Sequence, residues 1–392
     1  MTYSVDLRKG VDSAPGANSL LLCDEPGPLH GLGVGAAQKA PVVDPDPEVI
    51  LFNLKRRFTG VSATVNALAP LQATQWRLGY CGTPLPNGLP GSSLTRALWM
   101  SRKASRDRHI RIWHVRRDHE MVAGLFARDI LRLPVRLVFT SAAQHRHGGF
   151  PRWLISRMDA VISTTPLAAS FVPNTTAVVP HGIDLKRFSL VADKRIAWAA
   201  SGLPGQFGIG VFGRIRPDKG TDLFVEAMLR ALPLLPQAHA VIAGLAKGSD
   251  QAFLRSLQEK IQSAGLSSRI TFLGEVPAGE VHVWYQRCLV CVACPRYEPF
   301  GLTPFEAAAT GCALVCSRTG AFEQLVDPGV NGQLVPTNEF EQLTQAVVSV
   351  LSDPARAMQM GQNARQVVVD RFSLAAEAAG IARVYESLFE AR

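Results

Sequence analysis

Residues 295–320 read Pro-Arg-Tyr-Glu-Pro-Phe-Gly-Leu-Thr-Pro-Phe-Glu-Ala-Ala-Ala-Thr-Gly-Cys-Ala-Leu-Val-Cys-Ser-Arg-Thr-Gly. The apolar run Cys288 to Cys294 precedes them and predicts a buried strand. A loop then turns at Phe300-Gly301. A helix is expected from about residue 304, because Thr303 is a favourable N-cap and Pro304 suits the first helical position. This order places free N–H groups and the positive end of a helix dipole beside the loop, which suits a phosphate.

Two acidic residues stand in this stretch, and they call for different interpretations. Glu306 lies three residues after Thr303, so the pair fits a capping box in which the glutamate only closes its own helix. Glu298 lies on the loop before the helix and has no such structural role. We therefore interpret Glu298 as functional and leave Glu306 open between a cap and a ligand contact.

Strand and helix patterns alternate on both sides of this stretch. Strands are expected at 48–53, 110–115, 135–140, 159–164, 176–179, 206–212, 238–243, 270–273, 288–294 and 332–336. Helices are expected at 121–131, 153–158, 222–232, 253–264, 340–351, 354–369 and 374–389, with a further one beginning at about 62. The alternation predicts an α/β fold with parallel sheets covered by helices.

The alternation restarts once, which predicts two Rossmann-like domains with a boundary near residues 190–205. The expected divisions are 1–47, 48–190, 191–372 and 373–392. Residues 1–47 are rich in Gly, Pro, Asp and Ala, and we interpret them as a mobile or loosely packed extension. We interpret Asp44-Pro45-Asp46 as part of this linker.

The bulk composition is that of an ordinary globular protein. A chain of 392 residues suggests two or three domains, and no apolar run approaches the length of a membrane span. No signal-peptide pattern is present, so a cytoplasmic protein with reduced cysteines is expected. Cys288, Cys291 and Cys294 have metal-ligand spacing, but an alternating strand would place Cys291 on the face opposite the other two. We therefore expect no metal site there.

Basic residues are concentrated in the first half of the chain, although the net charge is only +9. Residues 102–117 carry seven Lys or Arg, and Lys55-Arg56-Arg57 form a second cluster. Gly60 follows that cluster at a strand-to-helix turn, where a glycine lets the backbone approach an anion. The pattern fits an anionic membrane surface or an acidic acceptor, and an ordinary solvated surface stays open as the alternative. Nucleic acid is not expected, because aromatic residues are sparse among the basic ones.

A glycine-rich string and a basic pair follow one another after residue 206. Gly208-Ile209-Gly210-Val211-Phe212-Gly213 matches the dinucleotide fingerprint, but its glycines lie inside a strand and no helix starts within it. We therefore reject a dinucleotide site. In the segment from Gly213-Arg214 to Lys219-Gly220, two cations flank a turn at the end of a strand. That arrangement predicts a diphosphate site.

These motifs together resemble the retaining glycosyltransferases of family 4, which have a GT-B fold with two Rossmann-like domains facing a central cleft. Gly213-Arg214 with Lys219-Gly220 resembles their diphosphate motif, and Glu298 with Glu306 resembles their motif of two glutamates seven residues apart. The segment 179–188 resembles their interdomain connection, with His181 where Asn is commoner. The resemblance extends from about residue 48 to 390.

The resemblance implies a role for each motif residue. Arg214 and Lys219 would bind the donor diphosphate and stabilise the leaving group, and Glu298 would hydrogen-bond the transferred sugar. Glu306 would bind the ribose hydroxyls, which makes a nucleotide sugar the donor. The remaining donor contacts would be Gly60, Gly213, Phe300, Gly301, Leu302 and Thr303. The domain 48–190 would bind the acceptor, 191–372 the donor, and the helix of 373–392 would cross back to the first domain. No metal or other cofactor is implied.

The first half also resembles the lipopolysaccharide-core mannosyltransferases, in the segments 52–61, 113–117, 139–144 and 153–155. This implies a GDP-mannose donor, an anionic lipid-linked acceptor, and work at the cytoplasmic face of the inner membrane. The implied acceptor contacts are Lys55, Arg56, Arg57, His114 and Arg116. Two positions depart from the family pattern. The first loop has Thr59-Gly60 instead of paired glycines, and Ala142 stands where many members have a histidine.

Besides the source of the histidine contact, three alternatives to this function remain open from the sequence. The sugar contact that many members make with a histidine at the position of Ala142 would come from His114, His145 or His147, or this chain would lack it. The donor could instead be a UDP-sugar used for another cell-envelope glycan, or the enzyme could be an epimerase acting on a nucleotide sugar without an acceptor. A non-enzymatic basic scaffold at a membrane or nucleic acid is the third reading.

Overall fold

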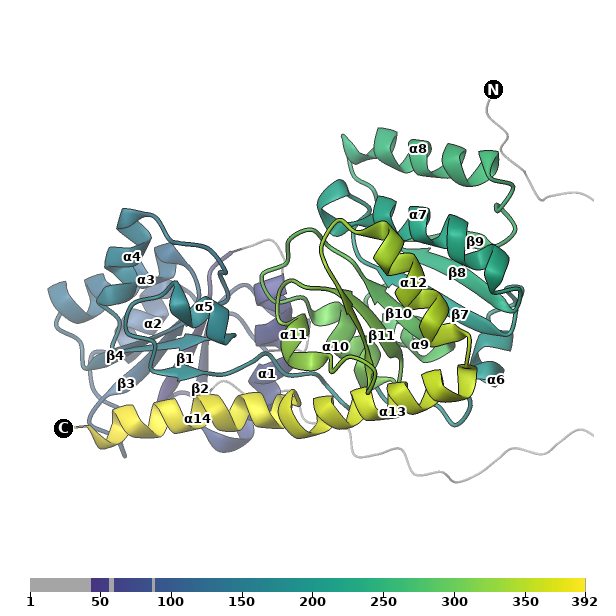
Figure 1. Ribbon diagram of the computed structural model, residues 1–392. Helices are drawn as coiled ribbons and strands as arrows, with labels where there is room; N and C mark the ends of the chain where they lie inside the picture. Colours follow the sequence, from purple (N-terminus) through teal and green to yellow (C-terminus); the bar gives the residue numbers. More distant parts are fainter. Residues whose placement is uncertain (1–43, 56–59, 87–88, 392) are drawn as a thin grey trace, which may run out of the picture. The chain divides into compact units, whose positions relative to one another are not determined.

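The computed structural model describes residues 44–55, 60–86 and 89–391. Within these residues the chain forms two six-stranded sheets whose strands are all parallel, with helices packed on their faces (Figure 1). The predicted α/β fold is therefore confirmed. Parallel sheets need helical crossovers and burial on both faces, which explains the nearly continuous apolar runs of the strands.

The elements alternate regularly along the chain. The first half comprises β1 (Val49–Asn53), α1 (Gly60–Gln75), β2 (Leu78–Gly82), α2 (Leu94–Met100), β3 (Arg111–Val115), α3 (Asp118–Leu125), the π-helix η1 (Phe126–Ile130), β4 (Val135–Ser141), α4 (Gly149–Ser156), β5 (Ala160–Ser163), α5 (Pro166–Ser170) and β6 (Ala177–Val178). The second half comprises α6 (Lys194–Ala199), β7 (Phe207–Phe212), the 3-10 turn η2 (Pro217–Lys219), α7 (Thr221–Ala231), the 3-10 turn η3 (Leu232–Leu234), β8 (Ala238–Ala243), α8 (Asp250–Ser263), β9 (Ile270–Gly274), α9 (Val281–Arg287), β10 (Cys288–Ala293), α10 (Leu302–Ala309), β11 (Ala313–Ser317), α11 (Phe322–Leu325), β12 (Gly332–Val335), α12 (Phe340–Leu351), α13 (Pro354–Arg371) and α14 (Leu374–Glu390).

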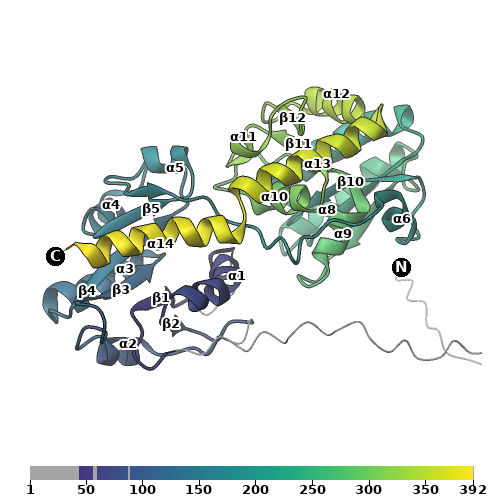
Figure 2. The ribbon, with the colours of Figure 1, turned by 90° about the horizontal axis from the view of Figure 1, so that it is seen from below.

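The first sheet has the strand order β2-β1-β3-β4-β5-β6. On one face, α2, α3 and α4 contribute Met100, Leu125 and Leu154 to a core with the strands. On the other face, α1 and the C-terminal helix α14 contribute Leu68 and Tyr385 to a separate core. Figure 2 shows α14, in yellow, beside the strands of this sheet. The last helix of the chain thus completes the core of the first half.

The second sheet has the order β12-β11-β10-β7-β8-β9. The chain enters at β7, fills one side with β8 and β9, and then returns to place β10 on the other side of β7. This is a topological switch point, and open α/β sheets bind ligands in the crevice beyond the strand ends at such a point. The ends of β7 and β10 are therefore where a ligand is expected in this half.

Two connections link the halves, and they are hydrogen-bonded to each other. The Ile183 amide donates to the Phe372 carbonyl, and the Leu374 amide donates to the Ile183 carbonyl. Glu377, on the first turn of α14, accepts from the Gly182 amide at 2.8 Å and lies 3.0 Å from His181 Nδ1. The first turn of α14 therefore fixes the connection at residues 181–183.

The described part of the predicted extension, residues 44–47, is packed against the first sheet, so its interpretation as linker was wrong. The Asp44 amide donates to the Leu78 carbonyl at 3.0 Å. The Asp46 carboxylate lies 2.5 Å from the guanidinium of buried Arg111, and it also accepts from the Arg106 amide. These ion pairs and hydrogen bonds outweigh the turn-forming tendency of the prolines. Residues 1–43 lie outside the described residues.

Other boundaries also differ from expectation. β2, α2 and α6 were not predicted, because glycines and prolines around residues 79–91 and Ala and Gly near 200 hide their periodicity. The helix expected at 121–131 is divided into α3 and η1. In β10 the pairing register shifts between Cys288 and Val290, so Cys288 and Cys291 share one core and Cys294 lies in the other. The predicted separation of Cys291 from both other cysteines was therefore wrong. Among the described residues no helix is both long and apolar enough to cross a bilayer.

Candidate active site

The candidate site lies where β7 and β10 end, and glycines form its backbone. After β7 the chain passes Gly213, with φ +137°, and Arg214, and then makes the turn η2 before Gly220, with φ +70°. A Cβ on Gly220 would collide with the backbone carbonyl of Cys294, just beyond β10. Only glycine therefore allows this loop to pass so close to the neighbouring strand end, as the predicted diphosphate motif requires.

Two of the predicted site residues, Lys219 and Glu298, form an ion pair. Lys219 Nζ lies 2.7 Å from Glu298 Oε2, and both side chains are partly buried. The sequence separates these residues by 79 positions, and the switch point brings them together. Lys219 thus stands between the carboxylate predicted to contact the sugar and the loop predicted to hold the diphosphate.

A second ion pair, which the sequence reasoning missed, fixes the two loops. Both guanidinium nitrogens of Arg296 bond the Asp222 carboxylate, at 2.8 and 2.7 Å. The Arg296 amide also donates to the Asp218 carbonyl at 2.9 Å. Such a bidentate pair adds geometric definition as well as energy. Arg296 therefore anchors the Glu298 loop to the Lys219 turn.

Helix α10 begins earlier than expected, so the prediction of Thr303 as N-cap was wrong. Gly301 is the N-cap, with φ +83°, and the helix starts at Leu302. Gly301 reaches this left-handed conformation without a Cβ, which would otherwise collide with the Phe322 ring. The first amides of α10 lack helical partners and face the loop, and Thr303 lies in the first turn instead of before it.

The capping-box alternative for Glu306 is wrong as well. Its carboxylate accepts a hydrogen bond of 3.0 Å from the Tyr285 hydroxyl on α9. Burial raises the pKa of Glu306, whereas the bond from Tyr285 and the charge of Arg187 lower it. Tyr285 is itself buried, with its ring centroid 4.3 Å from that of Phe212. The carboxylate is therefore held by another helix, at a residue that lines the cavity beyond β7.

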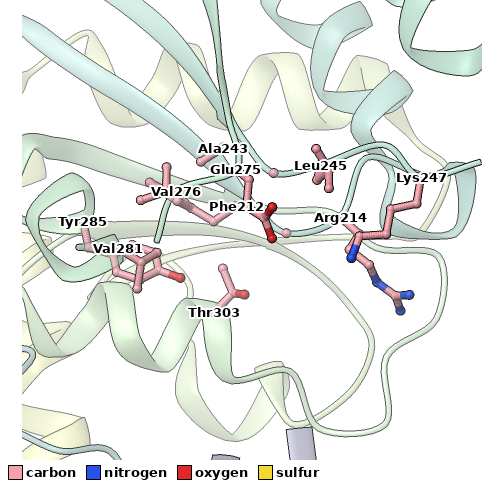
Figure 3. Close-up of a pocket in the computed structure, with 12 residues that line it drawn as sticks. Phe212, Arg214, Ala243, Leu245, Lys247, Glu275, Val276, Val281, Tyr285 and Thr303 are labelled. Carbon is pink, nitrogen blue, oxygen red and sulfur yellow. The ribbon is translucent and has the colours of Figure 1, made fainter. Parts of the chain in front are cut away.

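A cavity of about 280 Å³ extends from Tyr285 past the end of β7. Figure 3 shows Val276, Val281 and Tyr285 grouped at one end and Arg214 and Lys247 at the other. Arg214 and Lys247 are exposed and form no ion pair within the described part of the chain. An apolar end joined to a cationic end suits a nucleoside diphosphate, with the base at the apolar end.

A smaller cavity of about 70 Å³ adjoins the first one and shares Gly213 and Thr303 with it. Lys219, Glu298 and Gly301 also line it. The two cavities form one path, which Arg214, Lys219 and Glu298 line, whereas Glu306 lines neither cavity and is hydrogen-bonded to Tyr285, which does. Lys247 and Glu275 line the first cavity as well, and the sequence reasoning missed them. Both follow strand ends, β8 and β9, and that position was the available signal.

The predicted acceptor residues lie at the strand ends of the first sheet, and they differ in exposure and in contacts. Lys55 is exposed after β1, while Arg56 and Arg57 lie outside the described residues. Gly60 begins α1, and a Cβ there would meet no described atom, so packing does not demand the glycine. Arg116 follows β3. Its Nη1 is buried and has no partner among the described residues.

His114 was predicted as an acceptor contact, and its surroundings contradict that role. The side chain is fully buried; Nδ1 lies 2.5 Å from the Tyr385 hydroxyl and Nε2 lies 2.6 Å from Thr140 Oγ1. Burial holds the pKa of His114 well below its ordinary value, with a smaller effect of Arg116. Both ring nitrogens are therefore occupied, and His114 joins β3 to α14.

Two hydroxyls at this edge were missed by the sequence reasoning. Ser141 ends β4 and Thr164 follows β5, and both hydroxyls are buried without a partner in the part of the chain that the structure describes. Nearby, His145 Nδ1 lies 3.4 Å from the Tyr297 hydroxyl, and His147 Nε2 is buried without a described partner. Arg116, Ser141 and Thr164 thus give this edge unused polar atoms beside Ala142.

Comparison with known proteins gives the family. A model described as glycosyl transferases group 1 matches residues 199–367. The lipopolysaccharide core biosynthesis mannosyltransferase LpcC of Rhizobium leguminosarum bv. viciae is 43% identical over 347 residues, which are 88% of this chain and 97% of that protein. LpsB of Rhizobium meliloti (strain 1021), with the same description, is 42% identical over 349 residues, 88% of this chain and 98% of that protein. The chain belongs to the group 1 glycosyl transferases.

Solved structures agree with this assignment at the level of the fold. Alr3699/HepE of Anabaena, crystallised with UDP, has a TM-score of 0.75 at 19% identity and covers 87% of this chain and 100% of its own. Sucrose-phosphate synthase of Thermosynechococcus elongatus has a TM-score of 0.67 at 23% identity over 88% and 99%. The predicted GT-B fold is therefore confirmed, and the chain is a hexosyltransferase of the group 1 family.

Within this glycosyltransferase no group of three or more His, Cys, Asp or Glu side chains in the described ranges could hold a metal ion. Cys288 and Cys291 of β10 and Cys294 just after it are buried, and burial raises the pKa of Cys294 to about 12. Those thiols are therefore protonated and serve as small apolar side chains.

Proposed function

We propose that this glycosyltransferase moves a mannosyl group from GDP-mannose to the lipopolysaccharide core or a similar lipid-linked sugar, with retention of anomeric configuration. The observation that carries the proposal is its likeness, over nearly the full length of both chains, to two lipopolysaccharide core mannosyltransferases. The cavity at the switch point supports it, because the apolar and cationic ends fit a nucleotide sugar.

The donor would lie along the path already described. The base would contact Val276 and Val281, and Glu306 would accept hydrogen bonds from the ribose hydroxyls. The diphosphate would meet Arg214 and the first amides of α10. Negative charge develops on the diphosphate as the sugar leaves, and donors held in place before the reaction stabilise it most effectively. We propose that these groups meet this charge without a metal ion.

Lys219 and Glu298 would contact the donor on the two sides of the bond that breaks. Lys219 is bonded to Glu298 at 2.7 Å. The lysine would contact the phosphate oxygen while Glu298 accepts hydrogen bonds from the sugar hydroxyls. The ion pair therefore holds both side chains close to the positions in which they would act, which lowers the entropic cost of forming the complex.

The acceptor would bind at the first-sheet edge. An open cavity of about 620 Å³ at this edge is lined by Arg116 and Lys55. Arg116 has a buried guanidinium nitrogen without a described partner, and Lys55 is exposed. A carboxylate or phosphate on the acceptor would pair with Arg116 in a setting where charge-assisted bonds are strong. We further propose that the enzyme works at the cytoplasmic face of the inner membrane, where its lipid-linked acceptor would be.

The experiment that tests the function compares donors and products. The purified enzyme is screened against GDP-mannose, UDP-glucose and ADP-glucose by thermal shift, and each donor is then incubated with a delipidated core oligosaccharide lacking the mannose. The expected result is stabilisation by GDP-mannose and a product heavier by one hexose, linked with retained configuration. Transfer only from a UDP-sugar would contradict the donor assignment. Epimerised sugar from donor alone, or no donor binding at all, would overturn the proposed function.

A further inference from the structure

The cavity of about 280 Å³ beyond β7 contains a negative charge as well as the two cations already described. Glu275 is the one acidic residue among the described residues that line it, and its side chain is exposed. The carboxylate forms no hydrogen bond, and no ion pair within 4.0 Å, in the part of the chain that the structure describes. A carboxylate beside a diphosphate site repels the ligand unless another part of that ligand offers it hydrogen-bond donors. Glu275 therefore calls for such a donor group.

The ends of three neighbouring strands place Glu275 in the cavity. A glycine with positive φ stands at the end of each of β7, β8 and β9, namely Gly213 (+137°), Gly244 (+157°) and Gly274 (+69°). The backbones approach closely there, because the Gly244 amide donates to the Gly274 carbonyl at 2.8 Å and a Cβ on Gly244 would collide with the Gly213 carbonyl. The residue after each glycine lines the cavity: Arg214, Leu245 and Glu275. Glu275 is thus presented to the cavity in the same way as Arg214.

Glu275 lies next to the apolar end of the cavity, where the base would bind. Val276 follows it directly and belongs to that end. Figure 3 shows the Glu275 carboxylate between Val276 and Arg214. The loop beyond is held by the connection between the two halves, since the Arg187 guanidinium donates to the Ala278 carbonyl. The carboxylate is therefore carried by a loop that is fixed beside the proposed position of the base.

We propose that Glu275 selects guanine, by accepting hydrogen bonds from the N1–H and the 2-amino group of the base. These two donors lie side by side on guanine and match the two oxygens of a carboxylate, as in other bidentate pairs. Uracil offers one N–H between two carbonyl oxygens, and adenine offers a ring nitrogen acceptor beside its amino group. Each of these bases would turn a lone pair toward the carboxylate. The inference rests on the proposed function, because it names the residue that would determine its donor specificity.

The other parts of the donor are poorer partners for this carboxylate. The diphosphate carries charge of the same sign, and Arg214 and Lys247 line the same cavity without an ion pair to Glu275. The ribose hydroxyls are assigned to Glu306 in the proposed function, and a second carboxylate on the ribose would not distinguish one nucleotide from another. Recognition of the base is therefore the role that turns a repulsive charge into specificity.

The test compares the binding of GDP, inosine diphosphate and UDP to the natural chain and to Glu275→Gln, by isothermal titration. Inosine diphosphate lacks only the 2-amino group of GDP, so the ratio of their Kd values reports the contact to that group. The natural chain should bind GDP about tenfold or more tightly than inosine diphosphate or UDP. In Glu275→Gln the affinity for GDP should fall by about 10–100-fold and the ratio to inosine diphosphate should approach one, because the glutamine amide can accept from only one of the two donors.

The matched control is Glu280→Gln, which removes an equal charge from an exposed residue of the same loop that does not line the cavity. Its three Kd values should stay those of the natural chain. Unchanged affinities in Glu275→Gln would overturn the inference, as would an equal loss for all three nucleotides, which would place the carboxylate on the ribose. Both results leave the proposed function standing. A natural chain that binds GDP no better than UDP would instead overturn the donor assignment of the proposed function, and the inference with it.

Discussion

At the scale of single residues, the hydrogen bond between Tyr285 and Glu306 connects the core of the second half to the donor cavity. The tyrosine ring is buried against Phe212, so the direction of its hydroxyl is fixed by packing. Glu306 thus has one oxygen held by α9, through a residue that lines the cavity proposed for the donor. Tyr285 is a positioning residue in this account, because it acts on the nucleotide only through Glu306.

Replacing Tyr285 by phenylalanine removes this bond and leaves the ring in place. The KM for donor should rise severalfold while kcat changes little, since a misdirected Glu306 weakens ground-state and transition-state binding alike. The Tyr285 bond lowers the pKa of Glu306, so its loss raises that pKa and moves the acid limb of donor binding to higher pH. The measurement is a pH profile of kcat and KM for both proteins.

The matched control for that variant is Tyr80→Phe, which removes a buried hydroxyl that bonds the Thr83 carbonyl in the first half. Its cost in folding free energy should be similar, about 1 kcal/mol. Its donor KM and pH profile should stay those of the natural chain. A Tyr285→Phe profile that is also unchanged would show that Glu306 does not depend on this bond.

At the scale of elements, the sequence predicted the order of strands and helices well but placed their ends less well. The long apolar runs of β7, β8 and β10 are unambiguous. Arg214 and Lys219 could be singled out by their place at a turn after a strand and Glu298 by its place on a loop, whereas the role of Glu306 followed only from the family resemblance. The start of α10 could not be placed, because Thr303-Pro304 is a good local start signal. The helix instead starts after Gly301, whose left-handed conformation leaves room for the Phe322 ring. No local sequence pattern reveals this packing between distant residues.

The glycine loops that carry the site give a test at this scale. Gly220→Ala should cost clearly more than the roughly 1–2 kcal/mol of a left-handed residue with a side chain, because its Cβ would also collide with the Cys294 carbonyl. Donor affinity should fall with it, since the loop carries Lys219. Gly265→Ala is the control: its φ of +69° nearly equals the +70° of Gly220, but its Cβ would have open space. Chemical unfolding and donor titration of both variants check this, and equal effects would contradict the role of the Cys294 contact.

At the scale of the whole molecule, long-range contacts decided what sequence reasoning could not. His114 was predicted as an acceptor contact because the segment 113–117 resembles the lipopolysaccharide-core mannosyltransferases. The residue that occupies its Nδ1, Tyr385, is 271 positions away on α14. Likewise, Glu377 reaches the connection at His181 and Gly182 from the far end of the chain. Patterns of composition and period carry no information on such pairs, so the buried or open character of a histidine could not be predicted.

Buried neutral histidines make the stability of the whole chain depend on pH. The pKa of His114 lies well below its ordinary value, and that of His239 is lowered to about 4, both chiefly by burial. Below about pH 6.5 the unfolded chain binds protons at these sites while the folded chain does not. Unfolding free energy should therefore fall as pH falls, by up to about 1.4 kcal/mol per pH unit for each histidine.

Denaturant titrations from pH 7 to 5 measure how steeply the unfolding free energy changes with pH. His114→Gln should reduce this slope by the contribution of one proton, and an unchanged slope in His114→Gln would contradict the buried neutral assignment.

The central claim is that cations at the switch point of the second sheet stabilise the departing diphosphate, and one measurement tests it most directly. Steady-state transfer from GDP-mannose to the delipidated core acceptor is compared for the natural chain, Arg214→Ala, Lys219→Ala and the control Arg255→Ala, which removes an exposed arginine on α8. The account predicts that kcat falls by about 10²–10³ in the first two variants, with melting temperatures close to that of the natural chain, and is unchanged in the control. Near-normal turnover in both Arg214→Ala and Lys219→Ala would contradict it.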